Sequence, residues 1–183
     1  MNNLTVNDFI LLTIDEAFEK YELGDRLFEE LDSENKVKYY NGNLIIDSDF
    51  ILNDENNTVA GYLIAGKLEV KGNILDDSDA IIFLNVKDEV IAENIILKAS
   101  VVYFEDIVNV KNYIHISTIY SFLMTEEIIN AKALIIYKSY SSLNAKLNGN
   151  MININSSVDN SHSFENYFDI SNLKEILTDD LFD

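Results

Sequence analysis

The sequence predicts a mainly β protein, a single-chain parallel β-solenoid of about six coils with a helical cap at the N- and the C-terminus. Three observations favour this fold class. Similar phrases recur about every twenty residues, apolar residues alternate within each phrase, and the 183-residue chain contains no proline, which would remove hydrogen-bond donors from central strands. One unit of this length cannot bury its own apolar face, whereas stacked units share a continuous core.

Residues 1–40 are predicted to form the N-terminal helical cap, because their apolar residues lie close to helical spacing. These residues are Phe9, Ile10, Ile14, Phe18 and Tyr21, and the sequence DRLFEEL at residues 25–31 continues the pattern. A cap would cover the open strand edges at the end of a solenoid, which otherwise promote aggregation.

Residues 41–157 are predicted to form the solenoid. Phrases such as LEVKGNIL and EVIAENIIL align on the residue that precedes a short apolar run. The alignment points are Asp49, Asn73, Asn94, Asn112, Ala133 and Asn150, at intervals of 24, 21, 18, 21 and 17 residues. The alternating apolar bursts are too short for helices and are rich in Ile, Val, Tyr and Phe, which favours strands. The sequence lacks the helical half of leucine-rich repeats and the six-residue spacing of a left-handed hexapeptide helix.

The asparagines at the alignment points are interpreted as structural. Asn tolerates the left-handed backbone of a tight turn better than most residues. Stacked Asn side chains can also hydrogen-bond to one another along a ladder of strands.

Residues 158–183 are predicted to form a polar linker and a C-terminal helix. Ser171 is a suitable N-cap, and Leu173, Ile176, Leu177 and Leu181 follow on one helical face. The three regions together make one compact domain.

The charge of the chain indicates the kind of partner it can bind. With 32 acidic against 13 basic residues, the net charge is -19. Such a chain repels phosphate backbones and anionic membranes, so we expect no direct nucleic-acid binding, no membrane binding and a cationic partner. The alternative is that the acids only keep an apolar, strand-rich protein in solution. No secretory signal or apolar membrane span is found in the sequence, which favours a cytoplasmic protein.

No constellation of catalytic residues is recognisable, and we expect no enzyme activity, no cofactor and no metal site. Cysteine is absent, and the two histidines lie in unlike places. His115 alternates with Ile114 and Ile116 and is expected to point outward from a strand, and His162 lies in the linker. Two carboxylates in a cleft could hydrolyse a polysaccharide, but nearly every acid lies in a polar run or a predicted turn.

Adjacent acids recur in three successive coils, shortly before the alignment point. They are Asp88 and Glu89, Glu105 and Asp106, and Glu126 and Glu127, with the first pair displaced by one residue. Coils stacked about 4.8 Å apart would align these carboxylates along one edge. Like charges facing each other across strands destabilise a sheet, whereas a surface for a basic protein gains association rate from them. The alternative is that acids simply accumulate in turns.

The stretches GNLIIDSDFIL, GKLEVKGNIL and FDISNLKEILTDDLF carry a resemblance. The chain resembles the β-solenoid immunity proteins that are encoded beside bacterial polymorphic or contact-dependent growth inhibition toxins and contain bactofilin-like repeats. The resemblance implies a tight inhibitory complex with a cognate toxin, often a nuclease, inside the producing cell. It assigns no residues that contact the toxin.

Two functions therefore follow as expectations. The first is an immunity protein that occludes a basic toxin domain, with the six paired acids as candidate contacts. The alternative is a subunit of a bactofilin-like cytoskeletal filament, which would require open solenoid ends. A carbohydrate-active enzyme is a third, weaker hypothesis.

Overall fold

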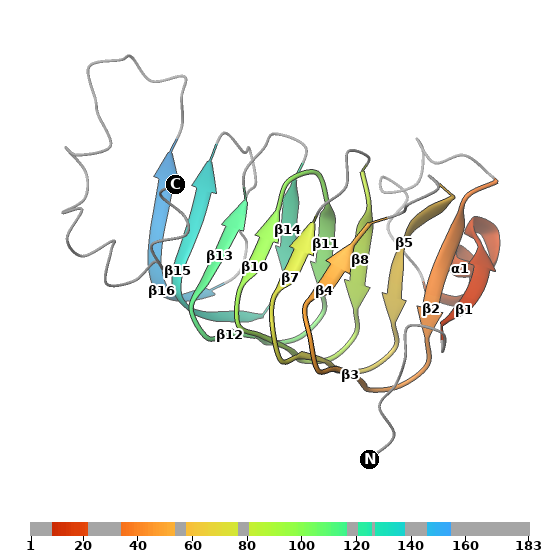
Figure 1. Ribbon diagram of the computed structural model, residues 1–183, viewed down its shortest axis with the longest axis horizontal. Coiled ribbons are helices and arrows are strands. Elements are labelled where there is room, and N and C mark those ends of the chain that lie inside the picture. Colours follow the sequence, from red (N-terminus) through yellow and green to blue (C-terminus); the bar gives the residue numbers. More distant parts are fainter. Residues whose placement is uncertain are drawn as a thin grey trace.

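The computed structural model describes residues 9–21, 34–53, 58–76, 81–116, 121–125, 127–137 and 146–154. In these residues the chain forms a parallel β-solenoid of about four turns with one short helix (Figure 1). The prediction of a mainly β, parallel solenoid is confirmed. The prediction of six coils and of helical caps at both ends is not supported.

Each of the four turns contains three strands. The first two turns consist of β2 (Lys36–Tyr40), β3 (Leu44–Ile46), β4 (Phe50–Leu52), β5 (Val59–Ile64), β6 (Leu68–Val70) and β7 (Ile74–Asp76). The next two consist of β8 (Phe83–Val86), β9 (Val90–Ala92), β10 (Ile95–Leu97), β11 (Val101–Phe104), β12 (Val108–Val110) and β13 (Tyr113–Ile116). Equivalent strands of successive turns pair in parallel, so that Val86 pairs with Ile64 of the turn before it and with Phe104 of the turn after it.

Three further strands extend the stack: β14 (Phe122–Thr125), β15 (Ile128–Tyr137) and β16 (Lys146–Ile154). β14 pairs with β11, β15 pairs with both β12 and β13, and β16 pairs with β15. Where earlier turns have two short strands, β15 runs on as one long strand with a register shift against β16 between Asn130 and Ala133. The repeat therefore changes at this end of the solenoid.

The strands form two sheets that enclose the main core. Sheet A has the order β1-β2-β5-β8-β11-β14, and sheet B contains the remaining strands. In Figure 1 the parallel strands of sheet A, from β2 to β14, run opposite to β4, β7, β10 and β13 across the interior. Alternate residues of both sheets point inward, and Leu52, Ile64 and Phe104 are among the largest side chains that are fully buried there.

The N-terminal edge of sheet A is covered by a strand, and the predicted helical cap over residues 1–40 is not supported. β1 (Ile10–Thr13) pairs antiparallel with β2, with Leu12 opposite Val37. It satisfies the edge of sheet A with backbone hydrogen bonds, which a helix packed on that edge could not supply. Ile10, assigned to a helix by its spacing, is therefore a strand residue.

The only helix in the described part of the chain is α1 (Ile14–Tyr21). Thr13 caps it: the Glu16 amide donates to Thr13 Oγ1 at 3.2 Å, and the Thr13 amide donates to Glu16 Oε2 at 2.8 Å. The hydrogen bonds that the Thr13 amide and hydroxyl donate to the Glu16 carboxylate lower the pKa of Glu16 below its ordinary value of 4.5. The predicted continuation at residues 25–31 and the predicted C-terminal helix lie outside the described residues.

Candidate functional site

The paired acids of the sequence lie in the connections that lead from sheet A to sheet B. These connections are residues 87–89, 105–107 and 126–128, of which Ile128 is already the first residue of β15. In the register of the sheets, Val86, Phe104 and Thr125 precede them, and Val90, Val108 and Ile129 follow them. Asp88, Asp106 and Glu127 therefore occupy the same middle position of successive turns. We call Asp88, Glu105, Asp106 and Glu127 the acidic corner.

The register explains why the first acid pair is displaced by one residue in the sequence. Glu105 takes the first position of its connection, where the preceding turn has Lys87. Glu89 instead takes the third position, level with Lys67 of the turn before it. Glu126, the remaining candidate, lies outside the described residues. The five described candidates thus lie in these connections. Glu89 is not counted in the acidic corner, because it stands level with a lysine and not with another acid.

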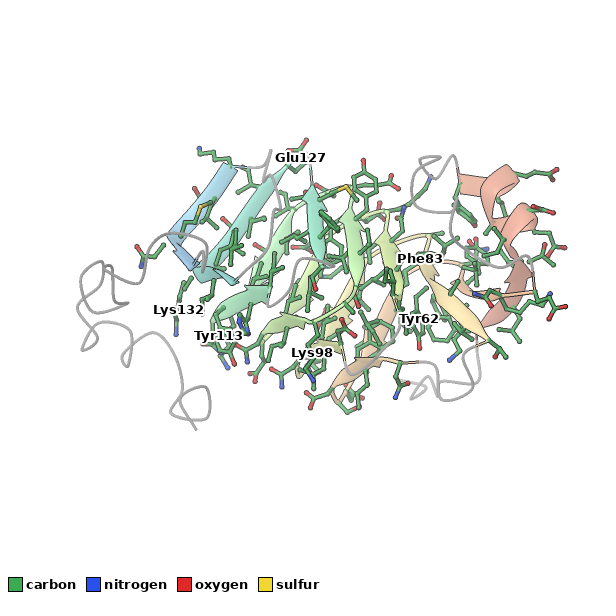
Figure 2. All side chains as sticks on the ribbon, turned by 90° about the horizontal axis from the view of Figure 1, so that it is seen from above. Tyr62, Phe83, Lys98, Tyr113, Glu127 and Lys132 are labelled. Atoms are coloured by element: carbon green, nitrogen blue, oxygen red, sulfur yellow. The ribbon has the colours of Figure 1, made fainter. Side chains whose placement is uncertain are left out.

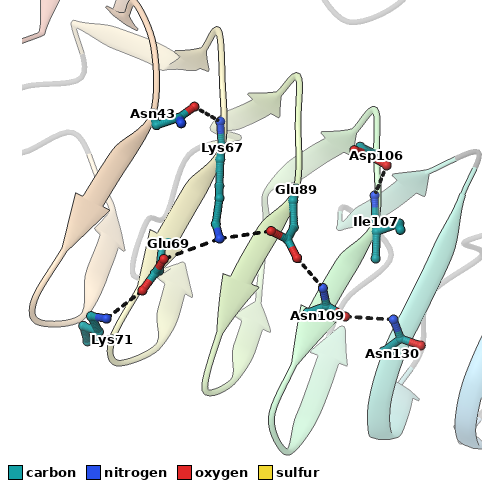
Figure 3. A network of polar contacts seen from close by, with 9 residues as sticks. All are labelled: Asn43, Lys67, Glu69, Lys71, Glu89, Asp106, Ile107, Asn109 and Asn130. Carbon is teal, nitrogen blue, oxygen red and sulfur yellow. Dashed lines mark hydrogen bonds and ion pairs between the residues drawn. The ribbon is translucent and has the colours of Figure 1, made fainter.

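The residues of the acidic corner differ in exposure. Asp88 and Glu127 are exposed, and Glu105 and Asp106 are partly buried. The carboxylate of Asp106 accepts a hydrogen bond from the backbone amide of Ile107 at 2.7 Å (Figure 3). Asp106 therefore helps to shape its own turn, which leaves Asp88 and Glu127 as the carboxylates that solvent reaches most freely.

Glu89 belongs to a separate polar network (Figure 3). It forms an ion pair with Lys67 at 3.0 Å and accepts a hydrogen bond from Asn109 Nδ2 at 2.7 Å. Lys67 also contacts Glu69 at 3.5 Å, and the hydrogen bond and charge of Glu89 raise the pKa of Lys67. Since the charge of Glu89 is balanced within the fold, Glu89 is a weaker candidate for partner binding than the acidic corner.

Two ladders of amide side chains run along the solenoid, as the stacking of asparagines predicts. In the first, Asn73 Nδ2 donates to Asp49 Oδ1 at 3.0 Å, and Asn94 Nδ2 donates to Asn73 Oδ1 at 2.7 Å. The buried Oδ1 of Asn94 has no hydrogen-bond partner within the described residues, so this ladder ends there. The interpretation of these asparagines as structural therefore has a direct geometric basis.

The second ladder escaped the sequence alignment. Asn130 Nδ2 donates to Asn109 Oδ1 at 2.8 Å, and Asn148 Nδ2 donates to Asn130 Oδ1 at 2.8 Å. Each of these asparagines comes shortly before an alignment point, at intervals similar to those of the first ladder. The recurrence of Asn after an apolar residue in VNV, INA and LNG was the signal that could have revealed it.

Replacing Asn73 with alanine should lower the free energy of unfolding by about 1–3 kcal/mol, because it removes the side chain that links Asp49 to Asn94. Chemical denaturation of the two proteins measures the difference. Asn41→Ala changes an exposed asparagine outside both ladders and is the matched control. An equal loss in the two variants would show that the ladder contributes no stability.

A shallow depression of about 450 Å³ lies beside the second ladder. Its lining includes Ile91, Asn109 and Asn130 together with Lys111 and Lys132. Lys111 is paired with Glu93 at 2.6 Å, and Lys132 donates to Asn112 Oδ1 at 3.1 Å. The asparagines of this depression hydrogen-bond to one another, and its lysines pair with Glu93 and Asn112 outside it. Among the described residues that line it, none is a carboxylate that could act as a general acid or base.

His115 lies on the outer side of sheet B, as its alternation with Ile114 and Ile116 predicts. It pairs with Ile96 in one direction and with Ile135 in the other, so its neighbours along the sheet are apolar. Burial lowers the pKa of His115 from its ordinary value of 6.5. Within the described residues, no group of three or more His, Cys, Asp or Glu side chains could hold a metal ion.

The lowered pKa of His115 predicts a loss of stability in acid. The unfolded chain binds a proton at His115 more readily than the folded chain, so stability should fall as the pH drops below about 6.5 towards the pKa of the folded state. His115→Leu should remove this contribution. Thermal unfolding of both proteins between about pH 5 and pH 7 tests it, and parallel curves for the two proteins would contradict it.

Comparison of the chain with models of protein families, with curated proteins and with solved structures finds no match. No helix in the described ranges is long and apolar enough to cross a membrane. The site must therefore be interpreted from its own geometry and charge.

Proposed function

We propose that this protein is an immunity protein that binds a cognate basic toxin domain of a bacterial polymorphic or contact-dependent growth inhibition system and neutralises it by occluding it. The single observation that carries the proposal is the acidic corner. The parallel register stacks Asp88, Asp106 and Glu127 in successive turns of a chain whose net charge is -19.

Asp106 shapes its own turn, whereas the exposed Asp88 and Glu127 are the carboxylates of the stack that a partner could use. Like charges opposite one another on paired strands cost some tenths of a kcal/mol each. A cationic partner reverses this cost, since complementary potentials speed encounter and suppress wrong partners. Glu89 shows how a carboxylate at this end of the strands is balanced within the fold, because it forms an ion pair with Lys67.

In this proposal the protein acts by binding the toxin and not by catalysing a reaction, in the cytoplasm of the cell that makes the toxin. In support, the depression beside the second ladder is shallow and lined by amides, lysines and small apolar residues. Such a surface offers contacts but no pair of groups for proton transfer or nucleophilic attack.

The filament alternative has less support. Head-to-tail stacking of parallel solenoids requires an open parallel edge at each end. At the N-terminal end of sheet A that edge is already occupied, because β1 pairs antiparallel with β2. A filament would have to add subunits against an antiparallel strand, which breaks the parallel order of the sheet.

The proposed function is tested by co-expression with the toxin domain encoded by the neighbouring reading frame. Growth should be restored when the two are expressed together, and the two proteins should purify as one complex. The variant carrying both Asp88→Lys and Glu127→Lys should protect less well at the same expression level. Failure of the native protein both to restore growth and to co-purify would refute the proposal.

A further inference from the structure

The outer face of sheet A, which points away from the main core, is covered at its N-terminal end. Leu12, Ile14 and Ala17 from β1 and α1 form a second apolar cluster with the outward residues Val37, Tyr39, Leu63 and Phe83. At the margin of this contact, Lys20 of α1 lies over the ring of Tyr39, at 4.7 Å from its centre. At one end, this face of the sheet is thus already covered by a helix that has an apolar face and a lysine at its edge.

The same face continues beyond α1 as an apolar surface. Phe83 pairs with Val101 and Val101 with Phe122, and Tyr103 pairs with Met124. We call Val101, Tyr103, Phe122 and Met124 the outer patch. Phe122 and Met124 are each 38% exposed, whereas Leu123 between them is buried in the main core.

The outer patch adjoins the acidic corner. Glu105 follows Tyr103 and Phe104 at the end of β11, and Glu127 follows the end of β14. Figure 2 places Glu127 on the opposite side of the molecule from Tyr113, which lies on sheet B. Apolar side chains and unbalanced carboxylates therefore occur together on one side of the solenoid.

We propose that the outer patch and the acidic corner form one docking surface for a basic amphipathic helix of the partner, an inference that rests on the proposed function. Apolar residues of that helix would cover Phe122 and Met124, as α1 packs its apolar side chains in one cluster with Val37 and Tyr39 of β2. Lysine or arginine residues at its edge would reach Asp88, Glu105 and Glu127. The apolar contact slows release, and the charges speed capture.

A synthetic peptide of about 18 residues with leucine at helical spacing and lysine at the other positions tests the surface. Its control is a peptide of the same composition in which the leucines no longer share a helical face. The full chain should bind the amphipathic peptide about tenfold more tightly than the control peptide, as measured by fluorescence anisotropy. Equal affinity for both peptides would overturn the proposal, because charge alone would then explain binding.

The variant carrying Phe122→Ser and Met124→Ser should lose this tenfold preference. Ile45→Ser with Ile51→Ser is the matched control, since these isoleucines are 48% and 44% exposed on other strands. Thermal unfolding of each variant establishes that it is folded. An unchanged preference in the Phe122 and Met124 variant would place the helix elsewhere and reject the proposal.

Because the chain contains no cysteine, one introduced thiol reports on the free surface. Met124→Cys should react with a maleimide about as fast as Ile45→Cys, and the amphipathic peptide should slow only the former. Protection of Met124→Cys in the free protein would overturn the proposal. Protection that is independent of concentration would mean that the chain covers its own patch, and protection that rises with concentration would mean that a second copy does.

The toxin domain separates this inference from the proposed function. If the toxin binds but the Phe122 and Met124 variant releases it no faster than the native protein, the docking surface is wrong and the proposed function stands. If no toxin binds, the proposed function fails, and the peptide comparison still decides whether the surface accepts a basic amphipathic helix.

Discussion

Replacing Phe104 with alanine should lower the free energy of unfolding by about 3–5 kcal/mol. Phe104 is fully buried at 0% exposure in the main core, on β11 between β8 and β14 of sheet A. Its removal would leave a cavity that the paired strands on both sides cannot close without losing register. Chemical denaturation monitored by circular dichroism measures the loss.

Phe122→Ala is the matched control for this change, because it removes the same side chain from the outer face of the same sheet. Phe122 is 38% exposed, so its truncation should cost about 1 kcal/mol. A similar loss of stability in the two variants would mean that the sheet does not separate a packed core from an outer face.

Reversing the two exposed charges of the acidic corner, with Asp88→Lys and Glu127→Lys, should slow association with the basic toxin domain by about 10- to 100-fold at low salt. The dissociation rate should change much less, since these carboxylates act mainly during encounter. Stopped-flow fluorescence or surface plasmon resonance separates the two rates.

Glu19→Lys with Asp47→Lys is the control for charge reversal. Both residues are exposed and lie away from the corner, on α1 and after β3, and the net charge changes by the same amount. The corner is specific only if its reversal slows association more than the control does. Equal slowing would mean that the overall charge of the molecule, not its placement, attracts the partner.

The solenoid could be predicted from sequence because the apolar alternation and the repeat describe the same local rule in every turn. The register of neighbouring turns then follows from the repeat, as the pairing of Asn73 with Asp49 and Asn94 illustrates. The number of turns was overestimated because the rule changes near Ala133. Earlier turns have Asn or Asp at that corner, whereas Ala133 favours no turn and lies inside the ten-residue strand β15.

The strand at the N-terminus was predicted to be helical because the spacing of apolar residues carries no information about a sheet edge that is free to pair. The residues Ile10 to Leu12 are apolar and suit either structure, and the edge of β2 decides in favour of a strand. Only from Thr13 onward, where the side chain caps the next turn, does the helix form. Local pattern therefore identified α1 but not the strand before it.

The acidic corner was only partly predictable for a related reason. The recurrence of acid pairs is visible in the sequence, but which acid of a pair is level with an acid of the next turn depends on its position within the three-residue connection. Glu89 shows the difference, since it is adjacent to Asp88 in sequence yet pairs with Lys67. The outer patch could not be recognised at all without knowing which strands α1 covers.

The middle carboxylates of the acidic corner recur once per turn, at a rung spacing of about 4.8 Å. Asp88 and Glu127, two turns apart, are thus separated by roughly one Debye length at 0.1 M ionic strength, which is about 10 Å. A cation that approaches in such a medium experiences the column as a single multivalent charge. At about 1 M the Debye length shrinks to about 3 Å. Each carboxylate then acts alone, so the distance over which the acidic corner attracts a cation shortens although its charge is unchanged.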